Sequence, residues 1–147
     1  MRKYLALLLP LVLVACASVR PSMRIEDAPQ DADVQVALAA LDSSPDCNIP
    51  LELTVRFEPI EEGHRVGETS ELPDGGGLLI RIDSRLTREE TVDVIEHEWA
   101  HAMTWRVPRP DCHDEIWGAA FSRCYRAVTA ALFPTEPLLG ERPEGSR

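Results

Sequence analysis

The chain has 147 residues, a formal charge of -10 and a hydrophobic fraction of 44%, which is the composition of one small folded domain. Its 25 Asp and Glu residues outnumber its 15 Lys and Arg residues, and the positive residues do not cluster. A protein that holds nucleic acid or anionic lipid by charge needs clustered Lys and Arg. We therefore expect no nucleic-acid partner.

The first fifteen residues have the pattern of an export signal. Arg2 and Lys3 supply a positive start, and an apolar run follows over residues 4–15. Pro10 interrupts this run, which is shorter than the roughly 20 apolar residues that a spanning helix needs. We therefore predict that residues 1–15 are a signal peptide rather than a membrane span.

The end of this signal, LVAC at 13–16, resembles the lipobox of bacterial lipoproteins. The resemblance implies that Cys16 is acylated, becomes the first mature residue and anchors the chain to a membrane of the bacterial cell envelope. Ala17 follows instead of Asp, which by analogy with lipoprotein sorting favours the outer membrane, facing the periplasm. The alternative is a secreted soluble protein in which Cys16 follows the apolar run by coincidence.

Composition divides the rest of the chain into three parts. Residues 16–31 lack periodicity and contain two prolines, which is typical of a tether. Residues 32–134 carry the periodic segments and are the predicted folded domain. Residues 135–147 are expected to form a flexible tail.

The first half of the domain predicts one helix and three strands. Apolar spacing over residues 34–41 predicts a short helix, and the alternation in LELTVRF at 51–57 predicts a half-buried strand. A weaker strand is expected at 64–66. The turn LPDGGG at 72–77 then leads into a third strand at 78–83.

The second half predicts two long helices. Thr87 with Glu90 three residues later forms a capping box, from which a helix should run over about 88–105. The proline-rich segment 106–112 ends it, and apolar spacing over 116–132 predicts the second helix. The expected fold is α+β, a small three-stranded sheet packed on these two helices.

Three cysteines remain after Cys16, an odd number for an oxidising compartment. One disulfide and one free thiol is the simplest outcome. Cys112 and Cys124 are unsuitable partners if the segment between them is helical, since twelve helical residues span about 18 Å. We therefore expect Cys47 to pair with one of them.

The first long helix carries HEWAH at 97–101, an HExxH motif. Residues four apart lie on the same helix face, so His97 and His101 can converge on one Zn²⁺. Glu98 would then lie beside the metal, where a carboxylate can accept a proton from a zinc-activated water. A chain of this composition contains the pattern by chance in roughly one case in a hundred. The alternative is two surface histidines on an amphipathic helix.

A catalytic zinc needs a third protein ligand and an open position. His113 is the preferred candidate because a short loop would return it to the same helix end. Asp111, Cys112, Asp114 and Glu115 surround it as alternative ligands or as partners of an imidazole N–H. Hydrolysis of a peptide bond usually also needs a further donor for the developing oxyanion. Tyr125 and His64 are weak candidates for that donor, and neither is assigned to the site.

HEWAHAMTW followed by CHDEIW resembles the core of SprT-like zinc metallopeptidases, over residues 87 to about 132. The resemblance implies a minimal zincin-like fold with His97, His101 and His113 on zinc and Glu98 as general base. Asp114 stands where that family usually has Gly, and no CxxC pair follows. We carry over the chemistry and not the family's substrate.

The expected function is a zinc-dependent metallopeptidase acting on a peptide or protein substrate. The alternative is a non-catalytic envelope lipoprotein that holds zinc, and Cys112 could close such a structural site. Glu98 distinguishes the two hypotheses, because hydrolysis needs a carboxylate beside the metal and zinc storage does not.

Overall fold

A computed structural model describes residues 21–61, 63, 65–108 and 111–134. The predicted signal peptide, Cys16, His64 and the predicted tail at 135–147 lie outside these ranges. Within them the fold is α+β, with a four-stranded mixed sheet and three α-helices. In chain order the elements are β1 (Met23–Glu26), α1 (Ala32–Ser43), the 3₁₀ helix η1 (Pro45–Cys47), β2 (Glu52–Glu58), β3 (Gly67–Glu71), β4 (Gly77–Asp83), α2 (Arg88–Met103) and α3 (Glu115–Leu132).

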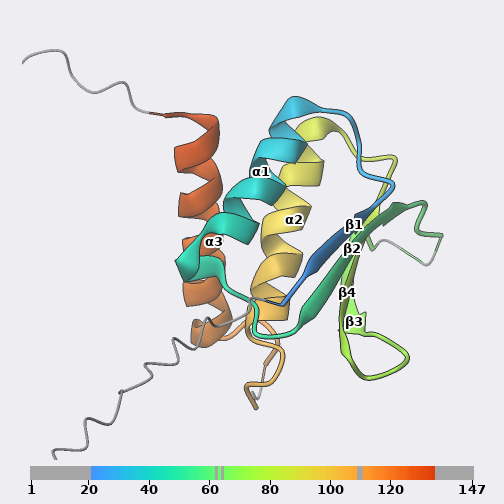
Figure 1. Ribbon diagram of the computed structural model, residues 1–147, viewed down its shortest axis with the longest axis vertical. Helices are drawn as coiled ribbons and strands as arrows, with labels where there is room; N and C mark the ends of the chain where they lie inside the picture. The colour runs from blue at the N-terminus through green and yellow to red at the C-terminus, as the bar shows by residue number, and fades with distance from the viewer. Residues whose placement is uncertain (1–20, 62, 64, 109–110, 135–147) are drawn as a thin grey trace, which may run out of the picture.

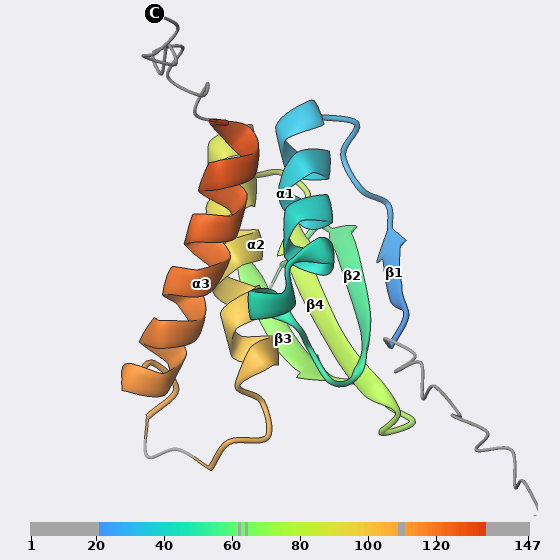
Figure 2. The ribbon, with the colours of Figure 1, turned by 60° about the vertical axis from the view of Figure 1, so that its left-hand side comes forward.

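The sheet has the strand order β1-β2-β4-β3 (Figure 2). β1, β2 and β4 are parallel, and β3 runs antiparallel to β4 at the edge. The apolar alternation of β2 matches that of β4, so that Leu53 pairs with Leu78 and Val55 with Ile80. These side chains are buried, because this face of the sheet carries the helices.

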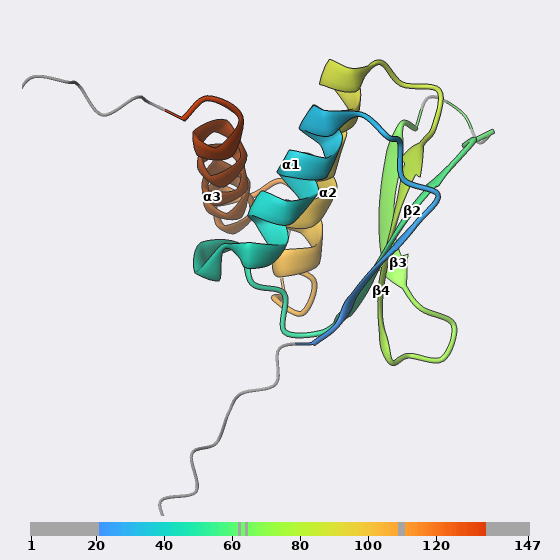
Figure 3. The same cartoon turned by 45° about the horizontal axis from the view of Figure 1, so that its top comes forward.

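The helices form two further layers beside the sheet. α1 and α2 lie side by side between the sheet and α3, which packs on the outer side of both (Figures 1 and 3). One hydrophobic cluster joins all three layers, and the Nε1 of Trp99 on α2 donates a hydrogen bond to the Cys47 carbonyl at 2.8 Å. α2 is therefore the central helix, and its two sides face different neighbours.

The sheet has one strand more than the sequence indicates. Met23–Glu26, expected to belong to the tether, form β1 and pair in parallel with β2, Met23 opposite Leu53. The fold therefore begins inside the expected tether and not at residue 32. The weak strand expected at 64–66 is also displaced, since the strand of this hairpin is β3, Gly67–Glu71.

The helix boundaries are close to those expected. The capping box is confirmed, with the Thr87 amide donating to Glu90 Oε2 at 2.9 Å and the Glu90 amide facing Thr87 Oγ1 at 3.4 Å. α2 ends at Met103, two residues before the expected end. α3 begins at Glu115, capped by the Asp114 side chain.

The expected disulfide is not present, because Cys47, Cys112 and Cys124 are all free thiols. Cys47 and Cys124 are buried in the core, and Cys112 is exposed. Burial, together with the neighbouring Cys47 thiol, raises the pKa of Cys124. In the described part of the chain no helix has the length and apolar character needed to cross a membrane.

Candidate metal centre

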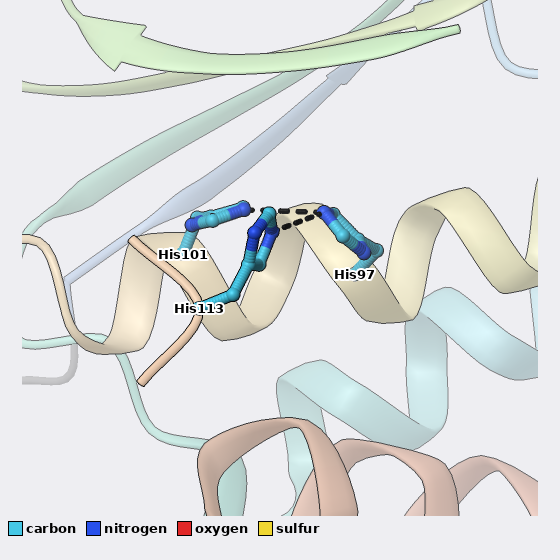
Figure 4. A group of neighbouring side chains, drawn as sticks. All are labelled: His97, His101 and His113. Carbon is cyan, nitrogen blue, oxygen red and sulfur yellow. Dashed lines mark hydrogen bonds between the residues drawn. The ribbon is translucent and has the colours of Figure 1, made fainter. Parts of the chain in front are cut away.

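Three imidazoles meet where the C-terminal half of α2 faces the turn before α3 (Figure 4). His97 and His101 stand one turn apart on α2, and His113 reaches them from the segment that precedes α3. The Nε2 atom of His97 lies 3.2 Å from Nε2 of His101 and 3.2 Å from Nε2 of His113. The ligand atoms of all three lie within 4.8 Å of one another.

The two 3.2 Å separations are within hydrogen-bond range, and they also suit three imidazoles that share one metal ion. Zinc–nitrogen bonds of 2.0–2.1 Å at tetrahedral angles separate two ligand nitrogens by about 3.3 Å, close to the observed separations. Burial, and the nearby His113, lower the pKa of His97. His97 is therefore held in the neutral form that can bind a metal. The donor set of three imidazoles fits Zn²⁺ and leaves room for a fourth ligand.

The turn that carries His113 is fixed by neighbouring acidic residues. Asp111 Oδ1 accepts a hydrogen bond from the His113 amide at 3.1 Å, and Asp114 Oδ1 accepts one from the Trp117 amide at 3.0 Å. Both carboxylates therefore hold backbone. Glu115 is exposed in the first turn of α3. Of the five candidates for a third ligand, His113 is the one grouped with both α2 histidines.

Cys112 lies on a different side of His113. Its Sγ is 3.6 Å from Nδ1 of His113, whereas Nε2 of that ring faces His97. Asp111, Cys112 and His113 form a second possible metal-binding group, but it shares only His113 with the first. Cys112 is thus adjacent to the histidine cluster without joining it.

Trp117 forms an aromatic wall beside the imidazoles. Its ring centroid lies 4.6 Å from that of His113 and 4.9 Å from that of His97, and Phe121 stacks behind it at 5.2 Å. Its Nε1 is buried and has no hydrogen-bond partner among the described residues. This packing restricts the orientation of the imidazoles before any ion binds.

Glu98 lies beside the cluster, on the side of α2 that faces β3. Its side chain is only 7% exposed, and its Oε2 accepts a hydrogen bond from the Thr69 hydroxyl at 2.7 Å. Burial raises the pKa of Glu98, and the bond from Thr69 partly offsets that effect. The result is a carboxyl group with increased proton affinity, held in a fixed position.

β3 approaches α2 closely at Gly67. A Cβ atom there would lie 2.6 Å from Val94 Cγ1 and 2.9 Å from Glu98 Oε1, so only glycine fits without displacement. Two cavities flank Glu98 at this approach. One, of about 460 Å³, is lined by Thr69, Glu98 and His101 among others, and the second, of about 360 Å³, by His97 and Glu98 among others. A substrate could reach Glu98 from either side.

The two weak candidates for an oxyanion donor gain no support. Tyr125 is 53% exposed on α3 and lines cavities to which none of the three histidines contributes. His64 lies outside the described residues.

Sequence reasoning missed Thr69, which is the hydrogen-bond partner of Glu98. Thr69 lies 29 residues before Glu98 in a strand that was expected three residues earlier. A threonine in a short polar strand carries no local signal of such a role. Only the packing of β3 against α2 brings Thr69 next to Glu98.

Comparisons with protein-family models, with curated proteins and with solved structures give no significant match to this chain.

Proposed function

We propose that this chain is a zinc-dependent metallopeptidase in which His97, His101 and His113 hold the metal and Glu98 is the general base. The observation that carries the proposal is the convergence of three Nε2 atoms beside a buried carboxylate that is not one of the three donors. The resemblance to SprT-like metallopeptidases and the zincin-like fold belong to the same proposal. The parallel strands with one antiparallel edge strand next to the HExxH helix are compatible with such a fold.

The residues have distinct tasks in this proposal. A bound zinc ion supplies the Lewis acid that polarises the scissile carbonyl and acidifies water. Glu98 accepts the proton of the attacking water and passes it to the leaving amine. Its raised pKa brings its proton affinity nearer to the working pH, which favours both transfers. Thr69 fixes the carboxylate, and Trp117 fixes the imidazoles.

The alternative of a non-catalytic zinc lipoprotein draws on Cys112, which could serve as a fourth ligand. A closed structural site usually has four protein ligands. Cys112, however, faces Nδ1 of His113 and is grouped with Asp111 and not with the α2 histidines. The two cavities beside Glu98 also favour a site that admits a further molecule.

We also propose a cellular location for the enzyme. The lipobox-like LVAC at 13–16 would anchor the mature chain through Cys16 to the outer membrane, facing the periplasm. Membrane fractionation of the wild type and of Cys16→Ser tests this, since the variant should leave the membrane fraction. Retention of the variant in the membrane would contradict the lipid anchor.

The proposed activity is tested by proteolysis of an unbiased peptide library with the zinc-loaded full chain. Glu98→Gln should keep about one zinc per chain and lose about 10²-fold or more of the hydrolysis rate, the usual contribution of a positioned general base. Glu96→Gln is the matched control on the same helix and should cleave like the wild type. Equal cleavage by Glu98→Gln, or no cleavage by zinc-loaded wild type, would favour the non-catalytic alternative.

A further inference from the structure

A separate cavity of about 280 Å³ lies between the N-terminal half of α2 and the C-terminal half of α3. None of the three clustered histidines contributes to its lining. Its walls are apolar where Val92 faces Val128 and Leu132, and Tyr125 and Phe133 stand exposed at its border. This volume is slightly below the usual range of about 300–1,000 Å³ for ligand pockets, so the cavity fits a small molecule.

Glu96 is the buried polar group of this cavity. Its side chain is 3% exposed, although it lines the cavity. Among the described residues, none donates a hydrogen bond to its carboxyl group or forms an ion pair with it. Glutamate is rarely buried without a partner, because desolvation of a carboxylate is costly. The missing partner is a donor or a positive charge, and the cavity is where it could enter.

The charges around the cavity favour a cation. Asp33, Glu89 and Asp93 line it together with Glu96, against a single positive residue, Arg88. The guanidinium of Arg88 is already held by Asp33 at 3.2 Å and by Glu89. The negative charges therefore exceed the positive ones, and an approaching ammonium group is attracted.

We propose that this cavity binds a small amphipathic amine, whose ammonium group pairs with Glu96 and whose apolar body packs against Val92, Val128 and Leu132. The ammonium supplies the hydrogen bonds that the buried carboxylate lacks, and charge-assisted bonds of this kind are about twice as strong as neutral ones. A neutral alcohol of the same shape donates one hydrogen bond to Glu96 but brings no positive charge, and an anionic ligand is repelled. The site is independent of the proposed hydrolysis, because it lies on another side of α2.

The test is a charge series on one ring, with benzylamine, benzyl alcohol and benzoate titrated into the full chain. Metal is removed with a chelator, so that the amine cannot bind zinc, and binding is followed by NMR. Benzylamine should bind about 10-fold or more tighter than benzyl alcohol, as expected for a charge-assisted pair in a desolvated site, with benzoate weakest. The shifted signals should include Val128 and Thr129.

Two variants test whether the preference for benzylamine over benzyl alcohol depends on the Glu96 carboxylate. Glu96→Gln should reduce the preference for benzylamine over benzyl alcohol to within about 2-fold, since the charge partner is lost. Glu98→Gln, a matched change on the opposite side of α2, should keep the full preference. Equal binding of all three ligands, or an amine preference that survives in Glu96→Gln, would overturn the proposal. If Glu96→Gln fails to fold, the ligand series and the mapped shifts on the wild type decide the matter.

Discussion

Two glutamates on α2, Glu96 and Glu98, are both buried but have opposite surroundings. Two residues of helix separate them by about 200° around the axis, so they point to opposite sides. Glu98 faces β3 and receives a hydrogen bond from Thr69. Glu96 faces α3, lines the cavity between α2 and α3 and has no hydrogen-bond or ion-pair partner among the described residues.

Burial is common to both glutamates, so burial alone does not mark Glu98 as the proposed general base. Burial raises the pKa of both glutamates, that of Glu96 to about 7. What distinguishes Glu98 is its neighbourhood, because three convergent imidazoles lie beside it and Thr69 fixes its position. The pKa of Glu96 is raised as well, but no histidine lines its cavity.

The largest expected effect is a loss of zinc affinity at the histidine cluster beside Glu98. His113→Ala removes one of the three proposed ligands and should lower zinc affinity by about 10²-fold or more, since even changes outside the ligand shell cost 10–100-fold. Metal analysis and competition with a chromophoric chelator measure it. Cys112→Ser, one residue away, should keep the wild-type affinity. Unchanged affinity in His113→Ala, or a large loss in Cys112→Ser, would transfer the third ligand to the Asp111 and Cys112 group.

The next effect concerns stability on the Glu96 side. The folded-state pKa of Glu96 is about 7 against an ordinary value of 4.5, so the folded protein binds this proton more tightly than the unfolded chain. The bound proton adds to the free energy of unfolding. This stabilisation is fully present below about pH 4.5 and is lost as the pH rises through 7, at about 1.4 kcal/mol per pH unit. Glu96→Gln should therefore be more stable than the wild type by about 3 kcal/mol at pH 8.

Urea unfolding of the metal-free full chain at pH 4.5, 6 and 8 measures this difference. The advantage of Glu96→Gln should shrink toward zero at the lowest pH, where the wild-type carboxyl is protonated. An advantage that does not change with pH would mean that Glu96 is not the titrating group.

The two helices that position the histidines were predictable from the sequence, because their signals are local. The capping box at Thr87 and Glu90 predicts where α2 starts, and four-residue spacing predicts that His97 and His101 share a face. The position of His113 beside the α2 histidines was predictable because the loop before it is short. Its convergence with His97 to 3.2 Å is consistent with that expectation.

The remaining features depend on contacts between distant segments. β1 has four residues and little periodicity, and only its pairing with β2, 30 residues away, makes it a strand. Thr69 and Gly67 became part of the site through the packing of β3 on α2. Glu96 likewise lacks a partner because the described residues of α3 offer its carboxyl group no hydrogen-bond donor. Local patterns carry no information on such contacts.

A smaller effect is expected where β3 approaches α2. Gly67→Ala places a methyl group 2.6 Å from Val94 Cγ1, so the strand and helix must separate. Overpacking of this kind typically costs about 1–3 kcal/mol, which thermal unfolding can measure. Gly118→Ala on α3 is the control, because nothing lies within 4 Å of its added Cβ and alanine favours a helix. If Gly67→Ala left the stability unchanged, β3 and α2 would be able to separate without loss of free energy of unfolding.

The smallest effect tests how Glu98 is held. Thr69→Val keeps the shape and the β-propensity of the side chain but removes the hydroxyl that donates to Glu98 Oε2. Because the bond positions the proposed base without touching substrate, kcat of the proposed hydrolysis should fall about 10-fold while KM stays near its wild-type value, a loss of about 1.4 kcal/mol. Thr69→Ser keeps the hydroxyl and should restore kcat to within about 2-fold. Zinc content should remain near one per chain in both variants. A Thr69→Val enzyme with normal kcat would mean that Glu98 needs no support from β3, and equal losses in both variants would assign the effect to packing and not to the hydrogen bond.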